Sequence, residues 1–316
     1  MVQTVPYQDS FKSAWNNFVG VAKNATFLFD RDYMDYHSDR FSDCSLLFFD
    51  KKRLVGLLPA NLHENIVFSH EGLTYGGLLL QKDVEYARID EMLEAAKCYY
   101  RDELKANILY YKPVPSIYHN YPSQEDLYWL FGQGAQLVAR SLSSAVELSC
   151  PQPFSTLRKR HAAKAAKNGL TVAAVTDERQ WKDFWNILSS VLSSRHQCCP
   201  VHSLDEILLL KRRFTDIRLF CVYKDTQMLA GSVIYITDRV LHAQYIAANE
   251  EGRLLGALDF LFLRLLSSPL CKGRIFFDFG ISTEQGGAFL NSGLLFQKEG
   301  FGARGVCYDH YRLNLA

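Results

Sequence analysis

Three short segments near the carboxyl end of the chain contain residue types that could act on an activated carbonyl group. Arg253-Leu254-Leu255-Gly256-Ala257 lies between an expected strand and an expected helix. Gly256 at a helix start would let a phosphate approach free backbone N–H groups, where the helix dipole favours anions. Asp278 ends a short apolar run, and Lys298 follows in a segment bounded by glycines. Together these segments predict a site for an anionic, activated donor, with Leu255 and Ala257 beside the anion.

Asp278 and Lys298 each have a chemical and a structural interpretation. A carboxylate at the carboxyl end of a central strand faces the edge where α/β folds bind ligands, but Asp278 could instead cap the following turn. A lysine on a loop could neutralise a developing oxyanion, or it could be an ordinary exposed residue. Tyr245 is a further candidate for moving a proton, and a strand N–H near Ala247 could stabilise the oxyanion.

A basic segment in the middle of the chain is expected to form a helix from Ser155 to a left-handed cap at Asn168-Gly169. Arg160, Lys164 and Lys167 are spaced i, i+4 and i+7, so they share one face, with Arg158 nearby. This face is either simply solvated or a clamp for a phosphorylated or anionic acceptor.

An earlier segment, Arg31–Asp43, is both aromatic and charged. We interpret it as too polar for the core, and therefore as a surface loop or as part of a cleft wall. In the second case Tyr36 would contact the substrate.

The elements that must position these residues lie in Phe220–Gly280. Two apolar, β-rich hairpins are followed by an apolar helix to about Leu266 and by a buried strand, Arg274–Asp278. A meander followed by a helix and a strand predicts an α/β layer in which the helix covers the sheet.

The same order of elements occurs once before. Similar residue types recur 175 positions apart: Phe48, Asp50, Val55 and Gly56 correspond to Tyr223, Asp225, Ala230 and Gly231. We therefore interpret the chain as a duplicated α/β (α+β) unit, each copy a mixed, mostly antiparallel sheet covered by helices. The predicted domains are residues 1–150 and 151–316, divided at the proline-rich segment Cys150–Pro153.

Composition narrows the function classes. The 316 residues are 48% hydrophobic and 22% charged, with a formal net charge of +1. This balance argues against nonspecific binding of DNA or tRNA, although a local basic patch remains possible. The sequence shows no secretory leader, no apolar helix long enough to span a membrane and no disulfide framework, so we expect a cytoplasmic protein. His196-x-Cys198-Cys199-x-x-His202 lacks a second ligand pair, so we expect no metal.

The basic helix, the segment Phe276–Gly280 and the closing segment Phe296–Gly302 together resemble a tandem GNAT-fold acyltransferase of the FemABX-like group. The resemblance implies two GNAT domains around a cleft and transfer of an acyl or aminoacyl group to an amine. It also implies that Arg158 or Arg160 holds the acceptor and that Lys298 aids transfer. GNAT proteins bind the pyrophosphate of coenzyme A with an Arg/Gln-x-x-Gly-x-Gly/Ala loop, which Arg253 and Gly256 match and Leu258 does not.

The resemblance leaves three functions open. Our first expectation is N-acyl transfer in the second domain from acetyl-CoA or another acyl-CoA, with no tightly bound cofactor. The acceptor would be the amine of a small molecule or cell-envelope precursor. The second is transfer from aminoacyl-tRNA to a cell-wall precursor, which the missing coiled-coil arm disfavours. The third is a non-catalytic binding protein. The first predicts that Lys298→Ala and Arg253→Ala each lower transfer tenfold or more, on the order of 1.4 kcal/mol.

Overall fold

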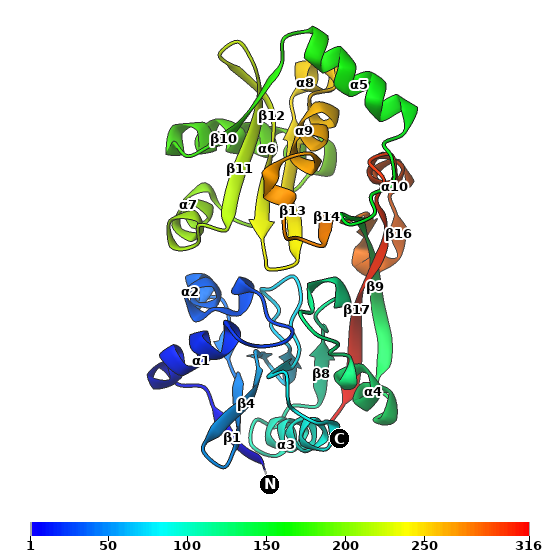
Figure 1. Cartoon of the computed structure of the whole chain (residues 1–316). Helices are drawn as coiled ribbons and strands as arrows, with labels where there is room; N and C mark the ends of the chain where they lie inside the picture. The colour runs from blue at the N-terminus through cyan, green and yellow to red at the C-terminus, as the bar shows by residue number, and fades with distance from the viewer. Residues whose placement is uncertain (1, 316) are drawn as a thin grey trace. The chain divides into compact units, whose positions relative to one another are not determined.

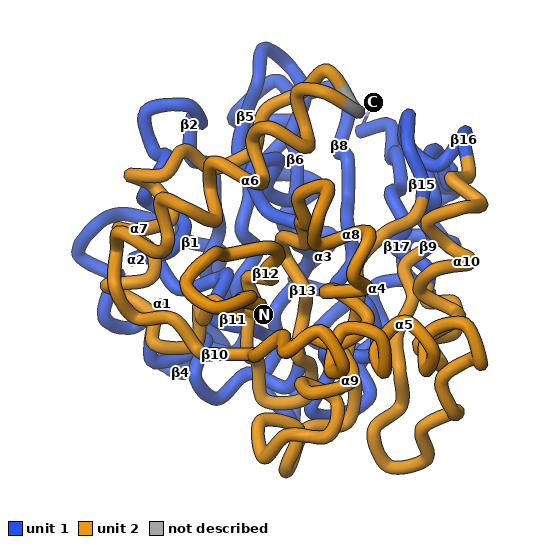
Figure 2. The backbone as a smooth tube through the Cα atoms, turned by 90° about the horizontal axis from the view of Figure 1, so that it is seen from above, with its two compact units in different colours: residues 1–142, 283–289, 307–316 blue, residues 143–282, 290–306 orange. Residues whose placement is uncertain are grey.

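The chain forms two compact units (Figure 1, Figure 2). The computed structural model describes residues 2–315, without the side chains of Arg195 and His196. Unit 1 contains the residues up to Leu142, Thr283–Phe289 and the residues from Cys307 onward, and unit 2 contains Ser143–Ser282 and Leu290–Val306. The chain therefore enters unit 2 before the expected boundary at residues 150 and 151. Its tail then returns to unit 1, which a division into two contiguous halves does not allow.

Unit 2 is built on one mixed sheet. Its strands follow the order β10 (Thr171–Val175), β11 (Ile217–Lys224), β12 (Gln227–Ile236), β13 (Val240–Ala248), β14 (Phe276–Ile281) and the final part of β9 (Gln136–Glu147). β13 and β14 run parallel, and the other neighbours run antiparallel. This is the mostly antiparallel arrangement that the sequence predicts.

Helices cover both faces of this sheet. Figure 2 shows β12 and β13 between α6 (Glu178–His196) on one side and α9 (Ala257–Leu266) on the other. α6 buries Trp181, Phe184, Trp185 and Leu188 at helical spacing. The other helices are α5 (Thr156–Lys167), α7 (Leu204–Arg213), α8 (Glu250–Leu255), the 3₁₀ helix η5 (Pro269–Cys271) and α10 (Ser292–Glu299).

Unit 1 contains two groups of strands. The first is antiparallel, in the order β1 (Val2–Pro6), β3 (Leu46–Asp50), β4 (Arg53–Leu58) and β7 (Leu79–Leu80). The second is the final part of β17 (Arg304–Asn314), β8 (Ile108–Tyr111), β6 (Ile66–Phe68), β5 (Asn61–His63) and β2 (Ser42–Asp43), with β6 parallel to β8. β15 (Thr283–Glu284) and β16 (Phe289–Leu290) are two short strands of the tail.

The main helix of unit 1 is α3 (Tyr86–Asp102), which buries Ile89, Met92, Leu93, Ala96 and Tyr100 at helical spacing. The other helices are α1 (Lys12–Val19), α2 (Arg31–Met34), α4 (Glu125–Gly132) and the 3₁₀ helices η1 (Asp9–Phe11), η2 (Phe27–Phe29), η3 (Asp35–His37), η4 (Ser116–Tyr118) and η6 (Gln285–Gly287). None of the helices in residues 2–315 is long and apolar enough to cross a membrane.

The two hairpins β3–β4 and β11–β12 have the same construction. A β-bulge follows Phe48 in one and Val222 in the other. The turn residue with positive φ is Lys51 (56°) in one and Asp225 (53°) in the other. Equivalent positions are therefore 174 residues apart (225 minus 51), so the spacing of 175 inferred from residue types is one too long. The shared bulge and turn support the duplication.

Three short segments have a conformation that their residue types do not predict. Phe27–Phe29, although apolar enough for a strand, is a 3₁₀ helix, and Phe289–Leu294 divides between β16 and the start of α10. Lys298 lies in the last turn of α10, not on a loop. Each of these segments is short, so its periodicity does not distinguish a helix from a strand or loop.

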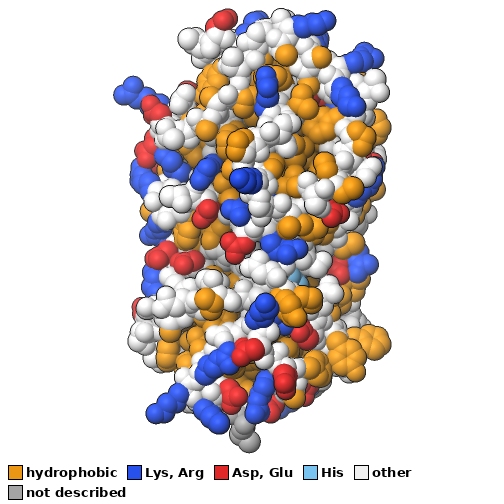
Figure 3. Space-filling view, in the orientation of Figure 1, with side chains coloured by type: hydrophobic (Ala, Val, Ile, Leu, Met, Phe, Trp, Pro, Cys, Tyr) orange, Lys and Arg blue, Asp and Glu red, His pale blue; other side chains and the backbone are white. Residues whose placement is uncertain are grey.

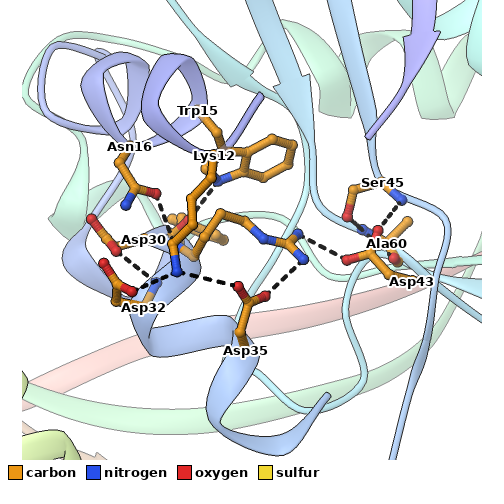
Figure 4. A network of polar contacts seen from close by, with 11 residues as sticks. Lys12, Trp15, Asn16, Asp30, Asp32, Asp35, Asp43, Ser45 and Ala60 are labelled. Atoms are coloured by element: carbon orange, nitrogen blue, oxygen red, sulfur yellow. Dashed lines mark hydrogen bonds and ion pairs between the residues drawn. The ribbon is translucent and has the colours of Figure 1, made fainter. Parts of the chain in front are cut away.

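The segment Arg31–Asp43 is more buried than its polarity predicts. Arg31, Tyr33, Met34 and His37 are all buried. The guanidinium of Arg31 lies 2.8 Å from Asp35 and 2.8 Å from Asp43, and it stacks over the Tyr7 ring at 3.8 Å. Figure 4 shows Lys12 pointing toward Asp32 and Asp35 in the same network. Pairing with the two carboxylates lets the Arg31 guanidinium leave water, so the segment is part of the folded body of unit 1.

Asp126 gives unit 1 a testable pH dependence. Its carboxylate accepts a hydrogen bond from the Tyr111 hydroxyl at 2.7 Å, and burial raises its pKa to about 6 from the ordinary 3.8. Because the folded state binds this proton more tightly, the stabilisation is full at low pH and is lost as pH rises from 4 to 6. In wild type the unfolding free energy of unit 1 should therefore fall by about 3 kcal/mol over this pH range, and Asp126→Asn should abolish that fall.

Urea unfolding at pH 4 and pH 6.5 checks this prediction. Glu85→Gln, which changes an exposed acid at the start of α3, should keep the wild-type pH dependence. Equal pH slopes in wild type and Asp126→Asn would contradict the assignment.

Candidate active site

One cavity of unit 2 opens where two parallel strands separate. β13 and β14 pair only from Val240–His242 to Phe276–Asp278. Beyond that point lies a cavity of about 330 Å³. Its walls come from the end of β13, from Phe279 of β14 and from α5, α9 and α10. Strand backbone that has lost its neighbour can bind a ligand there, so we regard this cavity as the candidate site.

Lys298 forms part of the cavity wall. Its side chain is almost completely buried, and Nζ donates hydrogen bonds to the carbonyl oxygens of Gly280 (2.8 Å) and Ile281 (2.6 Å). Burial lowers its pKa to about 8, although the charge of Asp278 acts in the opposite direction. A protonated amine has three donors, so one N–H remains for a ligand. The alternative of an exposed lysine is wrong.

Asp278 lies at the point where the strands separate, and it is fully buried. Its carboxylate accepts hydrogen bonds from Ser143 Oγ (2.5 Å) and from the Gly280 N–H (3.2 Å), and it lies 2.8 Å from Nδ1 of His242. The bond to Gly280 is the turn cap that one interpretation expects. Asp278 does not line the cavity, so it is placed to orient His242 and Ser143.

Sequence reasoning missed His242 and Ser143. They lie 36 and 135 positions from Asp278, and no local pattern connects them. The only available signal was the parallel pairing of two buried strands, which brings residues of β13 beside residues of β14.

Tyr245 contacts the layer on the α6 side of the sheet. Its hydroxyl lies 2.6 Å from His202 Nδ1 and accepts a hydrogen bond from the His202 N–H at 3.2 Å. Its ring packs edge-on against Trp185. Burial raises its pKa to about 12, so it keeps its proton at neutral pH. Tyr245 is not among the residues that line the cavity, whereas Ala247 is.

The segment around Gly256 is two helices instead of the expected loop. The Asn249 side chain accepts a hydrogen bond from the Gly252 N–H and starts α8 at Glu250. Gly256, with φ of 77°, then separates α8 from α9. A Cβ at Gly256 would lie 2.7 Å from the carbonyl oxygen of His161 in α5. A glycine is therefore required there by the helix junction and by the close packing of α5.

The other residues of this segment also have structural partners. Arg253 donates to the carbonyl oxygen of Ala248 at 3.1 Å, and it lines the cavity together with Gly256 and Ala257. Leu255 packs against the core and is not among the lining residues. Within Arg253–Ala257, Arg253 is therefore the residue that places a charged side chain at the cavity wall.

A buried carboxylate that the sequence analysis did not select also lines the cavity. Asp259 is the third residue of α9, where the helix N-terminus stabilises negative charge. It lies 2.9 Å from Arg158 Nη1 and 3.6 Å from His161 Nδ1. Burial raises the pKa of Asp259, while Arg158 and His161 oppose that shift. The only sequence signal was an acid interrupting an apolar helix.

This pairing changes the interpretation of Arg158. Its charge is balanced by Asp259 instead of being held ready for an acceptor. At neutral pH the lining nevertheless contains three cationic residues, Arg158, Arg253 and Lys298, against one acid, Asp259. The cavity therefore favours an anionic ligand.

The remaining candidates do not gather at the cavity. Arg160 is exposed, and Lys164 donates to the carbonyl oxygen of Leu254 at 2.9 Å. Tyr36 belongs to unit 1, where it stacks on His37 at 4.2 Å. None of these three residues is among those that line the cavity.

The residues considered for zinc do not form a site in the described part of the chain. No group of three or more His, Cys, Asp or Glu residues there could hold a metal ion. The side chain of His196 lies outside the described residues. His202 instead contacts Tyr245.

Residues 155–286 match the family model described as acetyltransferase (GNAT) domain. This range contains α5, β10 to β14 and the whole Gly256 segment. No protein of curated function matches the sequence significantly.

Several solved structures resemble the whole chain. FemX has a TM-score of 0.69 at 12% identity and covers 99% of this chain and 97% of its own. L-PGS from Bacillus licheniformis has a TM-score of 0.56 at 12% identity, and the match covers 98% of this chain and 92% of the L-PGS chain. A tandem GNAT protein from the clavulanic acid biosynthesis pathway has a TM-score of 0.52 at 12% identity, and the match covers 100% of this chain and 99% of the other. At such identities the likeness concerns the fold alone.

Proposed function

Since this chain has the tandem GNAT fold of the FemABX-like group, we propose that it is an acyltransferase acting on an amine. The observation that carries the proposal is the cavity between the diverging ends of β13 and β14, with buried Lys298 in its wall. The donor would enter this cavity in unit 2, and the amine would attack its carbonyl carbon.

Acyl-CoA, with acetyl-CoA as the first candidate, is the donor that the cavity supports best. Ile246, Phe262 and Phe279 provide apolar walls for a thioester arm. The diphosphate would lie near Arg253 and His161 at the lining, because Asp259 already provides a negative charge in the first turn of α9. This placement differs from the expected contact with the backbone at Gly256.

The reaction requires alignment and charge stabilisation. A C–N bond forms as the amine attacks, the C–S bond breaks, and the proton lost by the amine balances the thiolate that leaves. The backbone near Ala247 and the cationic Nζ of Lys298 would stabilise the oxyanion during this step. Asp278 would act as a positioning residue for His242.

Arg253→Ala tests the donor site. If Arg253 holds the diphosphate, the substitution should lower kcat/KM for acetyl-CoA about tenfold, mainly through KM. Steady-state transfer to a panel of amines measures the effect. Arg264→Ala removes an exposed cation of the same domain, which stacks on Phe260. This control variant should leave kcat/KM unchanged. Equal kinetics in wild type and Arg253→Ala would exclude Arg253 from the donor site.

A second candidate function is transfer from aminoacyl-tRNA to a cell-wall precursor. The observation in its favour is Asp259, whose charge in the first turn of α9 opposes a diphosphate at that place. A thermal-shift panel of acyl-CoAs, charged tRNA and nucleotide-sugars separates the candidates. Stabilisation by charged tRNA alone would favour the second, and binding without transfer would favour a non-catalytic protein.

A further inference from the structure

One helix of unit 2 carries a concentrated positive charge. Lys159, Arg160, Lys164 and Lys167 of α5 are all exposed. Residues 148–176 contain no Asp or Glu, so no acid within this stretch offsets these cations. The whole chain has a net charge of only +1. The charge on α5 is therefore a local feature, and Figure 3 shows Lys and Arg side chains gathered at the upper right, where α5 lies in Figure 1.

Exposed apolar side chains lie on α10 and on two segments beside it, Leu290 just before it and Ile281, whose carbonyl accepts a hydrogen bond from Lys298 of α10. Phe296 is 64% exposed, Ile281 45%, Leu290 44% and Leu294 37%. α10 adjoins the start of α5, because the Ser155 N–H donates to the Gly300 carbonyl at 2.8 Å. Figure 1 and Figure 2 both place α5 beside α10. Cations and apolar residues thus share one region of unit 2.

We propose that α5 and α10 form a face that docks on an anionic lipid bilayer. The cations would contact lipid phosphates, and Phe296, Leu290 and Ile281 would enter the interface. An RNA backbone would satisfy the cations equally well, and an unpaired base could stack on Phe296, but RNA would not cover the aliphatic side chains of Leu290 and Ile281. A bilayer offers both, so the combination favours lipid.

Docking on this face would bring the donor cavity to the membrane surface. Leu294 of α10 and Arg158 of α5 both line that cavity. The bilayer would therefore contact the region around the cavity, where an amine on a lipid-linked or membrane-adjacent acceptor becomes accessible.

Co-sedimentation with vesicles tests the proposal without any activity assay. The wild-type chain is mixed with vesicles of equal parts phosphatidylcholine and phosphatidylglycerol, and with vesicles of phosphatidylcholine alone. We expect binding only to the anionic vesicles, and weaker binding at high salt. The triple variant Lys159→Glu, Arg160→Glu, Lys167→Glu should bind at least tenfold more weakly.

Two further variants control for net charge and for folding. The triple variant Lys182→Glu, Arg218→Glu, Lys272→Glu changes the net charge equally at exposed positions outside α5 and α10, and it should bind like wild type. Phe296→Ser should weaken binding several-fold while its thermal unfolding midpoint stays unchanged. No binding to anionic vesicles, equal losses in both triple variants, or binding to tRNA but not to vesicles would overturn the proposal.

Discussion

Replacing Lys298 by methionine is expected to lower the transfer rate about a hundredfold, the usual cost of removing one oxyanion donor. Methionine fills a similar volume, so the change isolates the amine. Donor binding should change little, because Arg253 and the cavity walls remain. Single-turnover transfer and binding of acetyl-CoA, measured separately, check the two halves of this prediction.

The pH dependence gives Lys298 a second signature. Its pKa in the folded protein is about 8, so the cationic form that would stabilise the oxyanion is lost as pH rises through 8. The wild-type rate should therefore fall in that range, and Lys298→Met should not show this fall. The stability changes with pH in the opposite direction to the rate. The unfolded chain keeps this proton up to about 10.5, so the unfolding free energy rises from pH 8 to 10.5, by roughly 3 kcal/mol.

Lys112 of unit 1 is a matched control for Lys298. It follows β8, donates to the carbonyl oxygens of Leu73 (2.5 Å) and Glu71 (3.3 Å), and burial lowers its pKa to about 8 as well. Lys112→Met should affect stability in the same way but leave the transfer rate unchanged. If Lys298→Met also transfers at the wild-type rate, Lys298 serves only to hold the carbonyl groups of Gly280 and Ile281.

Local patterns were sufficient to predict the order of elements in unit 2. The hairpins, the apolar helix and the buried strand all follow from periodicity and turn residues within about ten positions. The repeat was also visible, but its offset was wrong by one. Asp50 and Asp225 match in type, whereas the positive-φ turn positions are Lys51 and Asp225. Matching the two hairpins by residue type therefore shifts their alignment by one position, whereas the backbone geometry of the turns defines the correct alignment.

The site depended on partners that are distant in the sequence. α5 was correctly predicted as a basic helix, but its charges look alike in the sequence. Only the fold shows that Arg158 is paired with Asp259, about 100 positions later, while Arg160 stays exposed. The burial of Lys298 could not be predicted for the same reason. The carbonyl groups that accept its hydrogen bonds lie 17 and 18 positions away, at the end of another element.

Replacing Arg31 by methionine is expected to destabilise unit 1 by about 3 kcal/mol, because the change leaves two carboxylates without their shared cation. Arg31 is 6% exposed by its side chain, and Asp35 and Asp43 are 29% and 31% exposed. Methionine still packs against the rings of Tyr7 and Trp15, so the loss would come mainly from charge. Hydrogen exchange in α1 and α2 measures this opening locally, without assuming that both units unfold together.

Two variants separate charge from packing in this network. Arg101→Met breaks an exposed pair with Asp102 at 2.7 Å and should leave exchange unchanged, since exposed pairs contribute little. Adding Asp43→Asn to Arg31→Met should recover part of the stability, because it removes the carboxylate that Arg31 pairs with at 2.8 Å, whereas Asp35 still has Lys12 at 3.8 Å. If it recovers none, the contact of the guanidinium with the Tyr7 ring at 3.8 Å, and not charge balance, holds this segment in the fold.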